Sequence, residues 1–106
     1  MDNKQKIVVV EDDAALLPMI THNLEKNGFS VREATNGEDA LMLIKEELPA
    51  LAIIDWMIPA PTGIEVCKIL RRWKETVSLP IIILSAKGEE EDKVRGLNTG
   101  ADDYIT

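Results

Sequence analysis

Residues 7–13 read Ile-Val-Val-Val-Glu-Asp-Asp, and this stretch decides the fold. Four consecutive β-branched residues are typical of a short strand that is buried on both faces of a sheet. Three acids end the strand, and the side chain of Asp12 or Asp13 can cap a helix that begins just after them. The stretch therefore predicts a buried strand that passes directly into a helix, with carboxylates at the junction.

The same succession of strand and helix recurs along the chain. Further strands are predicted at 29–34, 51–54, 81–84 and 101–106, and helices at 15–27, 36–48, 64–74 and 88–100. The second helix is expected to carry Leu48 on its apolar face and to end at Pro49. Strands that alternate with helices predict a parallel sheet with helices on both faces and right-handed crossover connections.

The composition favours one globular domain. The chain has 106 residues, of which 45% are hydrophobic, and this is enough for a single core. Acidic residues exceed basic ones by 19 to 12, and the net charge of −7 argues against nucleic-acid binding by this chain alone. We find no signal peptide and no apolar run near the ~20 residues that cross a bilayer, so we expect a cytoplasmic protein without membrane contact. Cys67 is the single cysteine, which excludes an internal disulfide and a Cys/His zinc site.

Polar residues follow three of the predicted strands, at the edge where sheets of this kind bind ligands. Glu11 and Asp12 follow the first strand, Asp55 the third and Ser85 the fourth. If the first and third strands are neighbours, their carboxylates meet in one crevice, where two charges about 4 Å apart repel by ~4 kcal/mol at an effective dielectric near 20. A proton or a cation must then neutralise them, and Mg²⁺ suits such oxygen ligands. The alternative is that the acids after the first strand serve only as a helix cap.

The motifs at these strand ends resemble the receiver domain of bacterial two-component response regulators, in the OmpR/PhoB class. The resemblance covers the whole chain and rests on residues 8–13, 54–59, 62–63, 84–86 and 97–106. It implies a flavodoxin-like (CheY-like) fold, a doubly wound sheet of five parallel strands in the order 2-1-3-4-5. It also implies one receiver domain over residues 1–106 that is C-terminally incomplete, because the family's last helix and the lysine expected directly after Thr106 lie beyond the sequence.

The resemblance further implies a role for each residue at the strand ends. Asp55 would be the phosphoacceptor, which takes a phosphoryl group from a sensor histidine kinase. The implied Mg²⁺ ligands are Glu11, Asp12, Asp55 and the main-chain carbonyl of Met57. Ser85 would contact the phosphoryl group, and Ser85 and Tyr104 would form the conformational switch. The domain would then be a regulatory phosphoacceptor rather than an enzyme.

The output implied by the resemblance is transcriptional. Phosphorylated domains would self-associate through the predicted fourth helix and fifth strand, and DNA would be bound only by a C-terminal effector domain outside this chain. Two alternatives are disfavoured. A magnesium-dependent phosphatase with an aspartyl nucleophile needs Asp-x-Asp after the first strand, which Glu11-Asp12-Asp13 does not provide. A flavodoxin-type carrier needs a phosphate-binding loop there, and three acids would repel phosphate.

Overall fold

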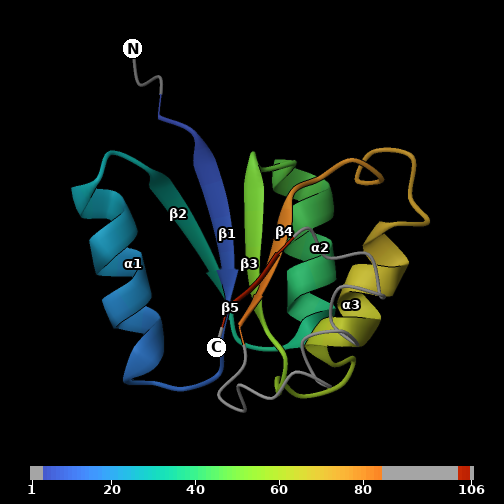
Figure 1. Cartoon of the computed structure of the whole chain (residues 1–106), viewed down its shortest axis with the longest axis horizontal. Helices are drawn as coiled ribbons and strands as arrows, with labels where there is room; N and C mark the ends of the chain where they lie inside the picture. The colour runs from blue at the N-terminus through green and yellow to red at the C-terminus, as the bar shows by residue number, and fades with distance from the viewer. Residues whose placement is uncertain (1–3, 85–102, 106) are drawn as a thin grey trace.

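The structure of the chain, a computed structural model, describes residues 4–84 and the backbone of 103–105 (Figure 1). The strands are β1 (Lys6–Val10), β2 (Ser30–Ala34), β3 (Leu51–Asp55), β4 (Ile81–Leu84) and β5 (Asp103–Ile105), and the helices are α1 (Leu16–Lys26), α2 (Gly37–Glu47) and α3 (Gly63–Leu70). The first four strands begin within one residue of their predicted starts. The predicted helix at 88–100 lies outside the described residues.

The five strands form one parallel sheet in the order β2-β1-β3-β4-β5, which confirms the predicted fold. β1 lies between β2 and β3, and Val10 at its end pairs with Ala34 on one side and with Ile54 on the other. Since Val10 and Ile54 pair in this register, the residues that come next along the chain, Glu11 after β1 and Asp55 at the end of β3, lie next to each other.

The core has two layers, one on each face of the sheet. Val8 and Val10 of β1 point into the larger layer with Ile54 of β3, and this layer lies against α2 and α3. The alternate residues Ile7 and Val9 belong to the smaller layer, with Leu17 of α1. Figure 1 shows α1 on one side of the sheet and α2 and α3 on the other. The four side chains of residues 7–10 are therefore buried, which is why this part of β1 contains only β-branched residues. No helix among the described residues is long and apolar enough to cross a bilayer.

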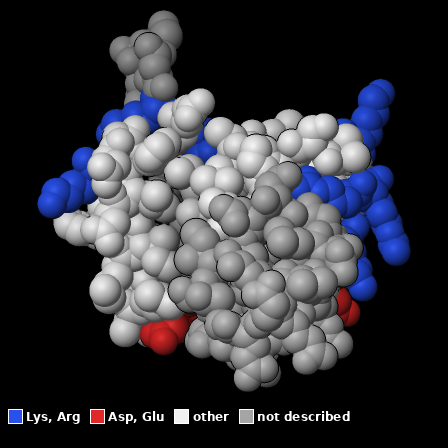
Figure 2. Space-filling view, in the orientation of Figure 1, with Lys and Arg blue, Asp and Glu red and all other residues white. Residues whose placement is uncertain are grey.

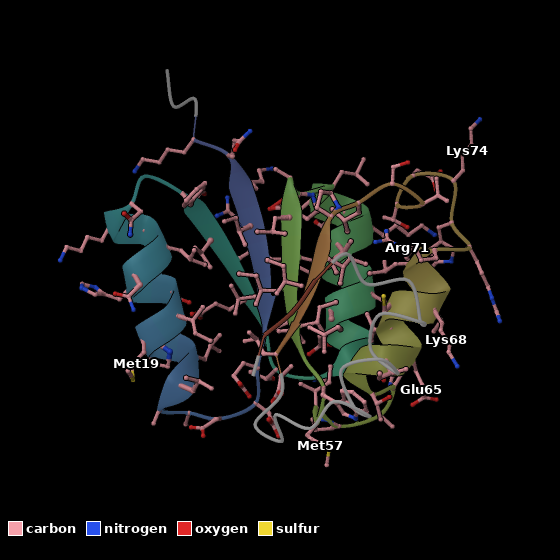
Figure 3. All side chains as sticks on the ribbon, viewed as in Figure 1. Met19, Met57, Glu65, Lys68, Arg71 and Lys74 are labelled. Carbon is pink, nitrogen blue, oxygen red and sulfur yellow. The ribbon has the colours of Figure 1, made fainter. Side chains whose placement is uncertain are left out.

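The prediction for the end of α3 was wrong, because the helix stops at Leu70, four residues early. The buried hydroxyl of Thr76 donates a hydrogen bond of 2.6 Å to the Leu70 carbonyl, which the helix would otherwise use itself. Arg71, labelled in Figure 3, donates from Nη1 to the carbonyls of Thr76, Val77 and Leu79 at 3.2, 3.3 and 2.6 Å. These contacts favour a compact turn over a further turn of helix.

The prediction for Leu48 was also wrong. Leu48 is the C-terminal cap of α2, with φ of 44° in the left-handed region, and its side chain is 54% exposed. The residue that follows is Pro49, whose ring disfavours the right-handed helical conformation at the position before it. The local conformation required before Pro49 therefore moves Leu48 off the apolar face that the helical spacing predicts.

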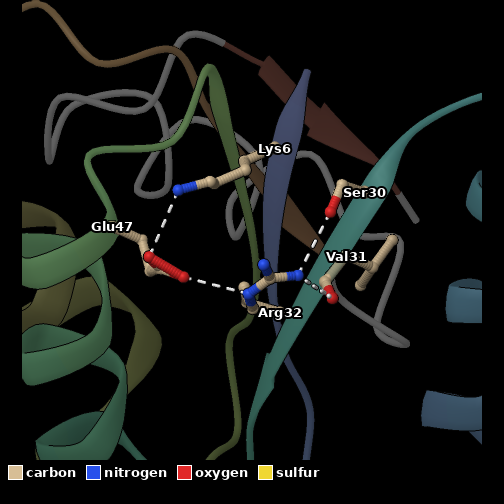
Figure 4. A network of polar contacts seen from close by, with 5 residues as sticks. All are labelled: Lys6, Ser30, Val31, Arg32 and Glu47. Atoms are coloured by element: carbon tan, nitrogen blue, oxygen red, sulfur yellow. Dashed lines mark hydrogen bonds and ion pairs between the residues drawn. The ribbon is translucent and has the colours of Figure 1, made fainter. Parts of the chain in front are cut away.

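A polar network ties α2 to the sheet at the edge remote from the acidic residues (Figure 4). The carboxylate of Glu47 accepts from Lys6 Nζ at 3.3 Å and from Arg32 Nε at 2.9 Å. Arg32 also donates to Ser30 Oγ and to the Val31 carbonyl. The two basic partners hold the pKa of Glu47 below its usual value. The network joins the end of α2 to the start of β1 and to the edge strand β2.

Candidate functional site

Three carboxylates converge at the carboxyl end of the sheet. One oxygen each from Glu11, Asp12 and Asp55 lies within 4.8 Å of the other two. Glu11 and Asp12 follow β1, and Asp55 is the last residue of β3. In Figure 2, which shares the orientation of Figure 1, acidic atoms are visible at the lower, carboxyl edge, and Lys and Arg lie along the two sides. The structure thus brings together the three acids that the sequence singles out.

Glu11 is the buried member of this cluster, with 2% of its surface exposed. Its amide donates to the Ala34 carbonyl at 3.0 Å, and its Oε2 accepts from the amide of Asp13 at 3.2 Å. Burial and, next, the side-chain contact with Asp55 raise the pKa of Glu11 to about 7. The metal-free cluster therefore favours a bound proton at this carboxylate, because burial disfavours its charged form and Asp55 lies beside it.

Asp13 has a separate structural role. Its Oδ1 accepts from the amides of Ala15 and Leu16 at 2.8 and 3.1 Å, at the start of α1. These backbone hydrogen bonds lower the pKa of Asp13. The N-cap residue of α1 is Ala15, which makes no side-chain cap hydrogen bond. Of the two sequence candidates, Asp13 is the one that binds the backbone just before the helix and at its first residue, and Asp12 remains in the carboxylate cluster.

The loop after Asp55 is held by backbone contacts. The amide of Trp56 donates to the Leu84 carbonyl at 2.9 Å, and the Trp56 carbonyl accepts from the amide of Gly63 at 3.1 Å. The amide of Met57 makes a long contact of 3.4 Å with Asp55 Oδ1. Met57 is exposed, and Figure 3 places its side chain beyond the carboxyl edge of the sheet.

Two glycines for which no role was expected, Gly37 and Gly63, pack against this loop. A Cβ at Gly63 would lie 3.0 Å from both the Asp55 carbonyl carbon and Trp56 Cα. A Cβ at Gly37 would overlap the carbonyl oxygen of Pro61 and lie 2.8 Å from its carbonyl carbon. In the sequence, each of these glycines directly follows the residue that caps a helix, Asn36 or Thr62. This position could have drawn attention to Gly37 and Gly63, but it does not show which residues they contact.

The two predicted switch residues are described only in part or not at all. Ser85 lies outside the described residues. Tyr104 lies in β5, where its backbone pairs with Ile83, and its side chain is outside the described part of the chain.

The donor set fits a hard divalent cation. Carboxylate oxygens are preferred ligands of Mg²⁺, which usually retains several waters and takes one or two carboxylates. Glu11, Asp12 and Asp55 offer such oxygens at the edge of the sheet, and Asp12 is exposed to solvent. A cation would also favour the charged form of Glu11, whose pKa is raised first by burial and next by its contact with Asp55.

Comparisons with known proteins agree with this arrangement. A family model described as the response regulator receiver domain matches residues 7–106. The chain is 52% identical over 100 residues to the phosphate regulon transcriptional regulatory protein PhoB of Rhizobium meliloti (strain 1021), covering 94% of this chain and 44% of that protein. It is 47% identical over 102 residues to the alkaline phosphatase synthesis transcriptional regulatory protein PhoP of Bacillus subtilis (strain 168), covering 96% and 42%.

A solved structure shows the same fold. The receiver domain of the Francisella response regulator 1452 is 40% identical, with a TM-score of 0.89 over 97% of this chain and 84% of that one. The chain spans less than half the length of the two curated relatives. Because the family model spans nearly all of the chain, and the sheet order and sequence identity agree with it, the chain belongs to the response regulator receiver domain family.

Proposed function

We propose that this domain is activated by transfer of a phosphoryl group to Asp55 from a sensor histidine kinase, with Mg²⁺ held by Glu11, Asp12, Asp55 and the main-chain carbonyl of Met57. The observation that carries the proposal is the convergence of three carboxylates within 4.8 Å at the ends of β1 and β3. Asp55 is the nucleophile in this proposal because it ends its strand and is only partly buried.

The transfer exchanges one bond to phosphorus for another. A carboxylate oxygen of Asp55 attacks the phosphorus, and the bond from phosphorus to the kinase histidine nitrogen breaks. The imidazole retains the electron pair of that bond and takes up a proton, and Asp55 becomes an acyl phosphate. A carboxylate is a weak nucleophile, so the step needs positioning and charge stabilisation. When bound, Mg²⁺ would supply positive charge for the phosphoryl oxygens.

Glu11 and Asp12 act in this proposal as cation ligands. They lie on the chain directly after β1, whose pairing with β3 fixes their separation from Asp55. Asp13 is engaged with the start of α1 and is not included in the ligand set. Met57 is included because it lies two residues after Asp55, in the same short loop.

The output is proposed from the relatives. Those relatives are named as transcriptional regulatory proteins and are more than twice as long as this chain. We propose that Ser85 contacts the phosphoryl group, that Tyr104 moves with it, and that the segment 88–106 mediates self-association. DNA binding belongs to a separate effector domain in this proposal, since the net charge of −7 disfavours contact with phosphate backbones. A location in the cytoplasm stays a prediction.

Incubation with acetyl phosphate and Mg²⁺, followed by intact-mass measurement, tests the phosphoacceptor assignment. The expected result is one added phosphoryl group, lost in Asp55→Asn and in the presence of EDTA. Glu38→Gln is a matched control, since Glu38 is an exposed acid in the first turn of α2, and it is expected to be phosphorylated normally. An adduct that persists in Asp55→Asn would show that another residue is the acceptor.

A further inference from the structure

We propose that Gly37 is a positioning residue for the phosphoacceptor site, because it lets the start of α2 hold the loop that follows Asp55. The inference rests on the proposed function. Gly37 is the first residue of α2, and its amide donates to the Pro59 carbonyl at 3.2 Å. The same residue packs so closely on Pro61 that a Cβ would overlap the Pro61 carbonyl oxygen and lie 2.8 Å from its Cγ.

The loop is held from two sides. At its end, the amide of Gly63 donates to the Trp56 carbonyl at 3.1 Å, and the Thr62 side chain and Glu65 form a capping box at the start of α3. In its middle, the contact with Gly37 fixes Pro59 and Pro61. The second contact joins segments that are more than twenty positions apart in the sequence, as their residue numbers show.

α2 cannot readily move away from the loop. Ala40 and Ile44, on the face of α2 toward the sheet, are completely buried in the larger core layer. Asn36 caps the helix, with its side chain accepting from the amide of Asp39 at 2.8 Å. Because a packed core resists displacement, a side chain at position 37 is expected to move the loop rather than the helix.

Pro59, which contacts Gly37, lies two residues after Met57 of the proposed cation site, so a displacement of the loop at Pro59 would shift that site. Pro59 is separated from Met57 only by Ile58, so the two residues belong to the same short segment of backbone. The main-chain carbonyl of Met57 is one of the proposed ligands, and Asp55 lies two residues before it. Residues that orient ligands without touching the metal typically change its affinity when they are replaced. Gly37 fits this description.

Gly37→Ala tests the proposal, with Gly28→Ala as the matched control. Gly28 has φ of 92° in the turn after α1, and its Cβ would meet nothing within 4 Å, so alanine there strains the backbone far from the site. Mg²⁺ affinity is read from Trp56 fluorescence in a Trp73→Phe background, and phosphorylation by acetyl phosphate is read from intact mass. We expect Gly37→Ala to weaken Mg²⁺ binding by about ten-fold and to slow phosphorylation.

Gly28→Ala is expected to lower the melting temperature by about 5 °C while leaving both readouts unchanged. If Gly37→Ala does not fold, Asn36→Ala is measured in its place. Loss of the Asn36 side-chain cap frays the first turn of α2 and should weaken Mg²⁺ binding, by a smaller factor than the roughly ten-fold loss expected for Gly37→Ala. The proposal would be overturned if Gly37→Ala, or Asn36→Ala where Gly37→Ala does not fold, bound Mg²⁺ as tightly as the control Gly28→Ala. Failure of the unmodified chain to bind Mg²⁺ or to be phosphorylated on Asp55 would instead refute the proposed function.

Discussion

Replacing Glu11 with glutamine should stabilise the metal-free domain at pH 8 and leave its stability at pH 4.5 nearly unchanged. Glu11 is almost completely buried beside Asp55, and its pKa is raised from 4.5 to about 7, first by burial. Between these two values the folded chain binds more protons at Glu11 than the unfolded chain. The free energy of unfolding therefore falls as the pH rises from 4.5 to 7, and the full penalty is present above pH 7.

The size of the effect follows from the same two values. One pH unit corresponds to about 1.4 kcal/mol, so the interval from 4.5 to about 7 gives an upper value of about 3 kcal/mol. Part of this penalty belongs to repulsion shared with Asp55, so we expect a gain of about 1–3 kcal/mol for Glu11→Gln at pH 8. Glutamine retains an oxygen that can accept from the amide of Asp13, as Glu11 does at 3.2 Å.

Urea unfolding in EDTA at pH 4.5 and pH 8 measures the effect. Glu25→Gln is the control, since Glu25 is an exposed glutamate of α1 remote from the cluster, and it should behave as the unmodified chain at both pH values. Mg²⁺ at ten times its dissociation constant should stabilise the unmodified chain by about 1.4 kcal/mol and Glu11→Gln by less. A gain at pH 8 no larger than that at pH 4.5, or a loss at pH 8, would refute the electrostatic argument.

Three further predictions concern the scaffold. Thr76→Val should lower the free energy of unfolding by about 1–2 kcal/mol in urea titrations, because the carbonyl of Leu70 loses its buried donor. Arg71→Met should lower the free energy of unfolding by about 1–3 kcal/mol, since three backbone carbonyls lose the guanidinium group that donates to them. Arg72→Met, at the exposed next position, is the control and should change the free energy of unfolding by less than about 0.5 kcal/mol. Glu47→Gln should lower the melting temperature slightly at pH 7 and not at pH 3. The basic partners of Glu47 lower its pKa in the folded chain, so the stability that the ionised carboxylate contributes is lost as the pH falls through this lowered pKa.

The strands were predictable because a buried parallel strand leaves a strong local pattern. Residues 7–10 are β-branched and buried in the structure, and residues 81–84 form a similar apolar run in β4, where Ile81 and Ile83 are buried. The end of α3 was not predictable from local pattern, since the decisive hydrogen bonds come from Thr76 and Arg71 to backbone that the turn itself creates. The exposed Leu48 shows a similar limit, because helical spacing predicts a face and not the conformation imposed by Pro49.

The acidic cluster was predictable for a different reason. Strand ends of a parallel sheet meet at one edge, so the acids after residues 10 and 54 must be neighbours once β1 and β3 pair. The sequence left open whether Asp12 or Asp13 caps α1. In the structure Ala15 is the N-cap residue and makes no side-chain cap hydrogen bond, and it is Asp13 that binds the backbone leading into the helix. The contact of Gly37 with the loop was missed because it depends on how two segments far apart in the sequence approach each other.

The carboxylate cluster cannot relieve its own repulsion by moving apart. Glu11 follows β1, an interior strand whose residues 7–10 are buried, and Asp55 belongs to β3, which pairs with β1 up to Ile54. The loop after Asp55 is closed by the backbone contact between Gly63 and Trp56. With the backbone fixed, only a proton or a cation can lower the electrostatic cost, and these two compete for the same oxygens. Neutralisation of the charge on Glu11, by a proton or by the proposed cation, is therefore the way in which this fixed backbone can lower the repulsion between Glu11 and Asp55.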